Sequence, residues 1–246
     1  MRNYIFNLAS RSNHSLFICQ HTKHMSTNSK SHIIKVKSLN ILPTFLKEAL
    51  IGIILSDGHL GKQYKNARLT ITFTKKYFLL ANYIYALFCK YSTPRGFQTR
   101  KVQSGKYSPY FGRITVTTLT SPIFTHYHNL FYKLSENGKY IKVIPLNIEE
   151  LLTPVVIAFF IMGDGNYNKI KKVIRLCTNS FTKSEVELLS RAILNKFGVE
   201  TRLEYTRNNQ YILVVRTSQV PKLQNIVKEH VHPSMLFRIG LPISNI

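Results

Sequence analysis

The sequence contains one type of segment twice, and this duplication limits the folds that are open to the chain. After Pro43-Thr44 an apolar stretch reads FLKEALIGIILSDG and ends at Asp57-Gly58, and after Thr153-Pro154 a second reads VVIAFFIMGDG and ends at Asp164-Gly165. Each predicts a buried helix, with the final Gly as a left-handed C-terminal stop. A repeat of about one hundred residues indicates two duplicated subdomains, because solenoid repeats span only ~20–50 residues.

The segments that follow the two apolar helices also correspond. Alternating apolar and polar residues predict a strand at 67–74 and a shorter counterpart at 173–178. A middle helix follows a Phe-Thr-Lys sequence in each half, and Thr182 with Glu185 predicts a capping box for the second one. After these come strands at about 97–103, 110–118, 200–206 and 210–216, and closing helices at 122–134 and about 219–230. We assign the order α-β-β-α-β-β-α to each half, in which alternation marks one of the two strands before the middle helix. This order, found twice, predicts an α+β protein with subdomains at 43–145 and 146–246.

The charge of the chain points to a polyanionic partner. There are 34 Lys and Arg against 11 Asp and Glu, a net charge of +23. No apolar run approaches the ~20 residues that a bilayer span needs, so a membrane is not expected as the partner. Because 44% of the residues are apolar, the chain can form a core, and the positive charge belongs to a folded protein. Nucleic acid is the expected partner.

Residues 1–42 differ from the rest of the chain. They are rich in Asn, Ser and His, and the first acidic residue is Glu48. Two interpretations stay open: a mitochondrial targeting segment, or a linker-like extension translated from upstream sequence. Cys19, His21 and His24 lie in this segment but lack a fourth ligand, so zinc is not expected. Three widely spaced cysteines also argue against a disulfide framework.

The chain has only two aspartates, Asp57 and Asp164, and both end an apolar helix. The helix dipole makes this position unfavourable for an anion, because the C-terminal carbonyls already present negative charge. A compensating cation is therefore expected, and carboxylate and carbonyl oxygens are ligands that Mg²⁺ (or Mn²⁺) accepts. Two ordinary Asp-Gly turns are the alternative, but their matching positions in the repeat favour a metal site.

Small residues indicate how the two aspartates meet. Gly52 in a helix interior costs about 1 kcal/mol relative to Ala, and with Ser56 one turn later it forms a small face. Gly163 offers a similar face on the second helix. If the two helices pack through these residues, Asp57 and Asp164 end side by side. Two like charges so close would repel, which again implies a metal ion.

The segments LIGIILSDG at 50–58 and IAFFIMGDG at 157–165 resemble the two motifs of the monomeric LAGLIDADG homing endonucleases of organellar introns. The resemblance covers about residues 44–242 and includes the closing HPSMLFRIGLP. It implies two pseudo-symmetric halves packed through the motif helices, a β-sheet saddle along duplex DNA, and acids that hold Mg²⁺ at the scissile phosphates. It also implies one active-site lysine in each half, and the matching positions are Lys142 in KVIP and Arg238 in RIGLP.

Two positions depart from the family pattern. Phe159 stands at the third position of the second motif, where the archetypal motif has Gly, so the helix interface is not expected to be strictly symmetric. Arg238 stands where lysine is expected. Arginine keeps the charge but does not deprotonate, so slower chemistry is expected from the second half.

The open strand faces are the expected DNA-reading surface. Alternation places polar and basic side chains on one face of the strands. His59, which follows the first motif, is interpreted as a structural residue. For any single strand residue a solvated face is the better interpretation, but together with the net charge the set favours DNA contact. The residues are Arg68, Thr70, Thr72, Arg113, Thr115, Thr117, Arg202, Glu204 and Thr206, with Arg175 and Arg216 as further candidates.

The resemblance implies a site-specific, Mg²⁺-dependent double-strand DNA endonuclease that acts as a monomer in mitochondria, with plastids as the alternative. An RNA-binding intron maturase is the competing function, since the family includes both. The two aspartates favour the nuclease, because a splicing cofactor has no need of metal-binding acids. A basic binding protein without catalysis is a third interpretation, and it gives no reason for aspartates to occur only in the motifs.

Overall fold

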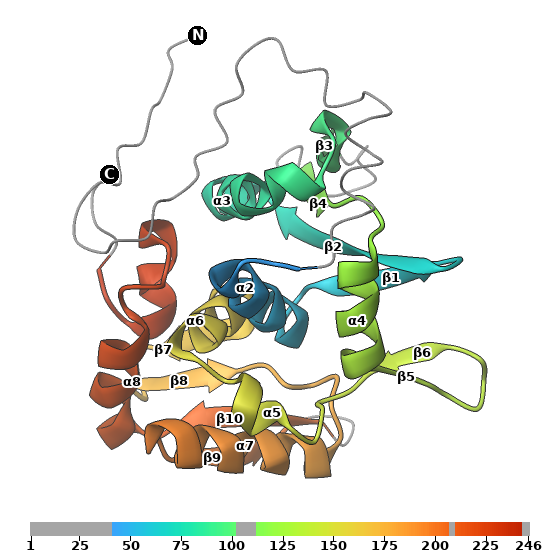
Figure 1. Cartoon of the computed structure of the whole chain (residues 1–246). Coiled ribbons are helices and arrows are strands. Elements are labelled where there is room, and N and C mark those ends of the chain that lie inside the picture. The colour runs from blue at the N-terminus through green and yellow to red at the C-terminus, as the bar shows by residue number, and fades with distance from the viewer. Residues whose placement is uncertain (1–40, 102–111, 207–209, 243–246) are drawn as a thin grey trace, which may run out of the picture.

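The computed structural model describes residues 41–101, 112–206 and 210–242. The predicted extension 1–42, with Cys19, His21 and His24, lies outside these ranges except for its last two residues. Figure 1 shows two sheets on either side of a central helix pair, α2 (Thr44–Leu55) and α6 (Pro154–Asp164). These are the two apolar motif segments, and they pack directly against each other.

In the first half a four-stranded antiparallel sheet carries two helices. Its strands have the order β1-β2-β4-β3. Ser121 caps the second helix by accepting a hydrogen bond from Ile123 N, and Pro122 takes the first helical position. The elements are β1 (His59–Gln63), β2 (Asn66–Thr74), α3 (Phe78–Phe88), β3 (Phe97–Lys101), β4 (Gly112–Thr117) and α4 (Pro122–Phe131).

The second half repeats this topology, with the strand order β7-β8-β10-β9. The expected capping box between Thr182 and Glu185 is present at its middle helix. The elements are β7 (Gly165–Asn168), β8 (Val173–Leu176), α7 (Lys183–Phe197), β9 (Thr201–Tyr205), β10 (Tyr211–Val215) and α8 (Val220–Val227). The predicted α+β fold of two αββαββα halves is confirmed.

A hairpin and short helical segments complete the described chain. The hairpin is β5 (Tyr132–Leu134) and β6 (Tyr140–Lys142), and the segments are α5 (Ile148–Leu151) and the 3-10 segments η1 (Lys75–Tyr77), η2 (Cys89–Tyr91), η3 (Pro94–Gly96), η4 (Thr217–Gln219) and η5 (Pro233–Ile239). The helix predicted at 122–134 is wrong at its end, because the chain leaves the helix at Phe131 and its next three residues pair with β6. In that pairing Tyr132 lies opposite Lys142, so the hairpin places this lysine.

The alternation of residues does not reveal β1 and β7. Among the residues of these strands whose burial is described, Leu60 in β1 and Gly165 in β7 are the buried ones, so no periodic apolar face is seen. Of the predicted strand ends, residues 102–103 and 110–111 lie outside the described ranges. Thr206 and Arg216 follow directly after β9 and β10 instead of belonging to them.

The glycines after the motif helices are not the left-handed stops that were predicted. Gly165 is extended, with φ −80° and ψ 150°, and Gly58 does not have a positive φ. A Cβ on Gly58 would lie 2.5 Å from Ile53 O, and one on Gly165 would lie 2.5 Å from Ile161 O. Glycine is needed at both positions because the chain folds back tightly on the last helical turn.

One continuous core joins the two halves. In β2 the side chains of Leu69, Ile71 and Phe73 are buried, so the intervening polar residues form the opposite face of the sheet. All residues of 155–162 in α6 are buried, which explains why this helix is apolar on every side. Within the described ranges, no helix has the length and apolar character to span a membrane.

Candidate functional site

The two motif helices approach closely because a glycine faces a larger residue at each crossing point. An ideal Cβ on Gly52 would lie 2.4 Å from Val156 O and 2.6 Å from Phe159 Cβ. One on Gly163 would lie 2.4 Å from Ser56 Cβ. No side chain fits at either glycine unless the helices move apart.

Phe159 fills the space beside Gly52. Its side chain is buried, its ring stacks on Tyr83 with the centroids 6.1 Å apart, and it meets Phe45 edge-on at 6.1 Å. Gly52 and Phe159 occupy equivalent positions of the two motifs, each five residues before the aspartate. The departure from the family pattern is therefore accommodated by a glycine on the facing helix.

The helix crossing brings Asp57 and Asp164 together at one end of the pair. Burial raises the pKa of Asp164 to about 7, and the negative charge of Asp57 adds to the rise, against the opposing effect of Lys142 and Arg238. Asp57 keeps an exposed side chain, yet desolvation by the surrounding protein also raises its pKa. Both carboxylates are therefore unfavourable as anions, even with two cations nearby.

Lys142 is anchored on the chain that flanks Asp57. Its Nζ donates to Ser56 O at 2.8 Å and to Gly58 O at 2.9 Å. Burial lowers the pKa of Lys142 to about 8, and the charges of Asp164 and Asp57 oppose this lowering. This side chain is thus a fixed cation that exchanges its proton close to neutral pH.

Arg238 is anchored next to the other aspartate. Its guanidinium donates to the carbonyl of Gly165, the residue after Asp164. The guanidinium carbon lies 5.2 Å from the centre of the Tyr77 ring, which belongs to the first half. Each cation therefore binds the backbone beside the aspartate of its own half, and Arg238 also contacts the other half.

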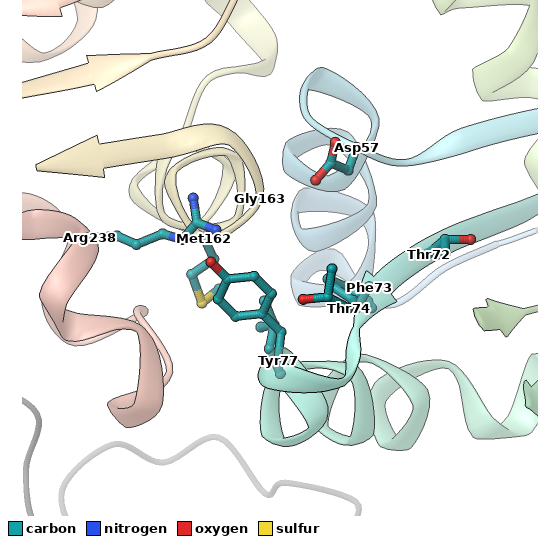
Figure 2. A pocket seen from close by; sticks show the side chains of 9 residues that line it. Asp57, Thr72, Phe73, Thr74, Tyr77, Met162, Gly163 and Arg238 are labelled. Atoms are coloured by element: carbon teal, nitrogen blue, oxygen red, sulfur yellow. The ribbon is translucent and has the colours of Figure 1, made fainter. Parts of the chain in front are cut away.

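A cavity of about 120 Å³ opens between these groups. Its walls include Asp57, Thr72, Thr74, Tyr77 and Arg238. Figure 2 shows Arg238 and Tyr77 reaching toward each other from opposite sides, with Asp57 and Thr74 across from them. The polar residues of the cavity wall thus lie between the open face of the first sheet and the end of the motif helices.

The open face of the first sheet carries the residues expected to read DNA. Thr70 lies opposite Thr117, and Thr72 lies opposite Thr115, with the two hydroxyls 3.4 Å apart. Arg68 alternates with the buried strand residues and is exposed. Arg113 is exposed and lies opposite Thr74. This half thus presents threonine hydroxyls flanked by two exposed arginines.

The second sheet presents a different surface. Glu204 in β9 pairs with Arg202 at 2.6 Å and with Arg175 of β8 at 3.4 Å. Between these charges β10 contributes Val214, which lies opposite both arginines in the strand register. Arg216 lies 3.9 Å from Glu200. Most of the candidate arginines here are therefore held in ion pairs.

Two aromatic residues at the site were not singled out in the sequence. Tyr77, which contacts Arg238, has no local signal except its place four residues after Phe73 of the first Phe-Thr-Lys. Tyr132 lies beside His59: its hydroxyl accepts from Leu60 N at 3.0 Å and is 3.4 Å from His59 Nδ1. His59 is exposed and held in one orientation at the start of β1.

The donor set at the helix ends fits a divalent cation of the Mg²⁺ type. The carboxylates of Asp57 and Asp164 are hard oxygen donors, and their raised pKa values mean that Lys142 and Arg238 do not offset their burial. Among the described residues, no three or more His, Cys, Asp or Glu gather where they could hold a metal ion. Any further ligands would be water, backbone carbonyls or phosphate oxygens, which Mg²⁺ commonly takes.

Known proteins are similar to this chain in sequence over most of its length. Cytochrome b mRNA maturase bI2 of Saccharomyces cerevisiae is 28% identical over 225 residues, covering 87% of this chain and 51% of the maturase. The chain thus spans about half the length of that relative. Probable intron-encoded endonuclease 1 of Wickerhamomyces canadensis is 26% identical over 223 residues, which is 87% of this chain and 92% of that protein.

A solved structure supports the two-half saddle fold. It is that of the homing endonuclease I-WcaI bound to its DNA recognition sequence, with a TM-score of 0.73 and 24% identity, covering 89% of this chain and 96% of that one. The model of the LAGLIDADG DNA endonuclease family matches residues 47–223. This chain belongs to the LAGLIDADG DNA endonuclease family.

Proposed function

We propose that this protein is a site-specific endonuclease that hydrolyses both strands of a duplex DNA target with the help of a divalent metal ion, in intron homing. The observation that carries the proposal is the meeting of Asp57 and Asp164 at the helix crossing, each beside a cation of its own half. A purely structural role gives no reason to place two partly desolvated carboxylates, one of which raises the pKa of the other, at helix C-termini.

Each group has a role in this reaction. Asp57 and Asp164 would hold the metal, which when bound supplies Lewis acidity and a more acidic water. Lys142, with its pKa near 8, would stabilise negative charge that develops on the phosphate or order the attacking water. Arg238 would stabilise charge at the second strand without exchanging a proton. The open sheet faces would hold the duplex, with the first sheet reading bases through hydroxyls and arginines.

Two features support a single chain acting on duplex DNA in an organelle. Both aspartates and both cations lie in one polypeptide, so no second copy is needed to complete the site. The net charge of +23 suits a phosphate backbone. Mitochondrial location is proposed from the basic, acid-free segment 1–42 and the organellar resemblance.

Cleavage-site selection tests the proposal. The protein is incubated with a randomised duplex library and Mg²⁺, and the ends of cleaved molecules are sequenced. We expect one enriched site cut on both strands, and no cutting with chelator or with the Asp164→Asn variant. Cleavage without an enriched sequence would contradict site specificity, and its absence at any metal concentration would contradict the nuclease.

The second candidate is an intron maturase, favoured by the name of the yeast relative. It predicts splicing assistance that survives Asp57→Asn and Asp164→Asn, since RNA binding needs neither carboxylate. A splicing assay on the host intron, run with the same two variants, separates this function from DNA cleavage.

A further inference from the structure

We propose that Tyr77 of the first half is a positioning residue for Arg238 of the second half, so that the cutting of one DNA strand depends on an aromatic ring of the opposite half. This inference rests on the proposed function. It concerns a residue with no described hydrogen bond to either aspartate, whose ring contacts the guanidinium and lines the cavity beside Asp57.

The contacts of Arg238 leave its guanidinium underdetermined without Tyr77. One terminal nitrogen donates to Gly165 O, while the buried Nε has no hydrogen-bond partner among the described residues. The Tyr77 ring centre lies 5.2 Å from the guanidinium carbon, and the ring of Phe237 lies farther, at 5.9 Å. A cation within about 6 Å of a ring face is attracted to it, and Tyr77 is the nearer of these two rings and the one that belongs to the opposite half.

Lys142 has two backbone carbonyl groups as acceptors, whereas Arg238 of the second half has one. Its ammonium is fixed by two carbonyl groups, Ser56 O and Gly58 O, both in its own half. Arg238 has one such carbonyl and uses Tyr77 in place of the other. The planar guanidinium of arginine must also be oriented, whereas the compact ammonium of lysine needs only to be placed.

The two halves reach across to each other from equivalent positions. Tyr77 is the fourth residue after Phe73, and Glu185 is the fourth residue after Phe181, the first residues of the two Phe-Thr-Lys sequences. Glu185 accepts a hydrogen bond from Ile144 N at 3.1 Å, two residues beyond Lys142. The Glu185 contact is made to backbone, whereas Tyr77 acts on the cation itself. Arg238 of the second half thus has an aromatic contact from the first half.

The position of Tyr77 also decides what lies beside Arg238. Tyr77, Arg238, Thr72 and Thr74 line the same cavity next to Asp57. A guanidinium held against the ring stays beside this cavity, where its remaining N–H groups would be placed to donate to phosphate oxygens. Without the ring the guanidinium gains alternative rotamers, and fewer molecules have it in place.

The test measures the two strands separately. A duplex carrying the selected target is labelled differently on each strand, and single-turnover rates are measured for the parent, Tyr77→Leu, Tyr77→Phe and Arg238→Met. We expect Tyr77→Leu to slow one strand roughly tenfold, the loss of about one cation–π contact. The slowed strand should be the one that Arg238→Met slows. The Tyr77→Phe variant, which keeps the ring, should cut this strand at the parent rate. In the Arg238→Met background, Tyr77→Leu should have no further effect.

The other strand and a second tyrosine provide controls. The strand that depends on Lys142 should keep its rate in the same molecule, and Tyr211→Leu, which removes a ring of the second sheet 5.9 Å from Lys183 Nζ, should slow neither strand selectively. If Tyr77→Leu lowers the melting temperature markedly, Tyr77→Met keeps the bulk without the ring. Equal slowing of both strands, or additivity with Arg238→Met, overturns the positioning role. A parent protein that cuts no duplex overturns the proposed function instead.

Discussion

Ser56 and Gly163 occupy equivalent positions in the two motif helices, one residue before the aspartate, and they touch each other across the helix crossing. A Cβ on Gly163 would lie 2.2 Å from Ser56 Oγ and 2.4 Å from Ser56 Cβ. Gly52 and Phe159 form a second pair of this kind. In both pairs only one partner has a side chain, so the interface that joins the aspartates tolerates a side chain from one helix but not from both.

Swapping serine and glycine between positions 56 and 163 should therefore be tolerated better than placing a side chain at both positions. Gly163→Ser alone should lower the free energy of unfolding by about 2–3 kcal/mol, because the added atoms overpack the crossing. The double change Gly163→Ser with Ser56→Gly should recover more than half of that loss, measured by urea unfolding. Gly61→Ala, where the nearest neighbouring atom is 3.6 Å from the new Cβ, serves as the control. Equal instability of the single and double variants would contradict the pairing.

Asp57→Asn and Asp164→Asn should each abolish double-strand cleavage. The change is nearly isosteric, so the variants should still fold and should melt no lower than the parent, and target binding should persist or tighten because a negative charge facing the phosphates is gone. Melting, binding with Ca²⁺ and cleavage with Mg²⁺ are measured on each variant. A single variant that still cuts both strands at near-parent rate would remove the metal-site assignment.

The metal-free protein should become more stable as the pH falls from about 7 toward 4. The folded-state pKa of Asp164 is raised from 3.8 to about 7, so in this window the folded state binds more protons than the unfolded state, and the contribution of this group to stability grows on acidification. Above pH 7 the ionised carboxyl is destabilising. Asp164→Asn should therefore raise the melting temperature in chelator at pH 8. The melting temperatures of this variant at pH 8 and pH 5 should differ less than those of the parent. A parent and variant with parallel pH profiles would contradict the shift.

Arg238 should make one strand the slower one. A supercoiled plasmid carrying the site should pass through a nicked intermediate, because the half with Lys142 acts first. Arg238→Lys should shorten the lifetime of that intermediate, since lysine restores the residue type expected for this position. Gel analysis of a time course provides the measurement. Undetectable nicking, or a longer-lived nick in the variant, would show that the assignment of Arg238 is wrong.

Glu204→Gln should strengthen binding to duplex DNA of any sequence. The carboxylate now engages Arg202 and Arg175, and its removal frees two guanidinium groups for phosphates. Affinity should rise several-fold at low salt and fall more steeply with salt than in the parent, because more counterions are released. Titrations are made in Ca²⁺ to suppress cleavage. Glu187→Gln on α7, which removes an exposed pair with Lys183, is the matched control and should change little.

Much of the protein follows from the sequence because burial leaves a periodic record along the chain. The apolar motif helices, the alternation of β2 around Leu69 and Ile71, and the capping box at Thr182 are all local patterns that match the elements formed. The duplication places the two aspartates at equivalent positions, and small residues in the motif helices indicate that the helices can approach. Two halves, two acids and a basic open surface are thus determined by composition and spacing.

The tertiary structure decided the features that depend on packing between segments far apart in the sequence. Tyr77 meets Arg238, and Glu204 holds Arg175, only because separate strands and halves come together. Gly58 and Gly165 serve close chain approach, and not the left-handed turn that a helix-ending glycine predicts, because strands β1 and β7 leave the helices at once in extended conformation. Contacts between distant segments leave no periodic pattern in the sequence, so local patterns do not predict which cation contacts which aromatic ring.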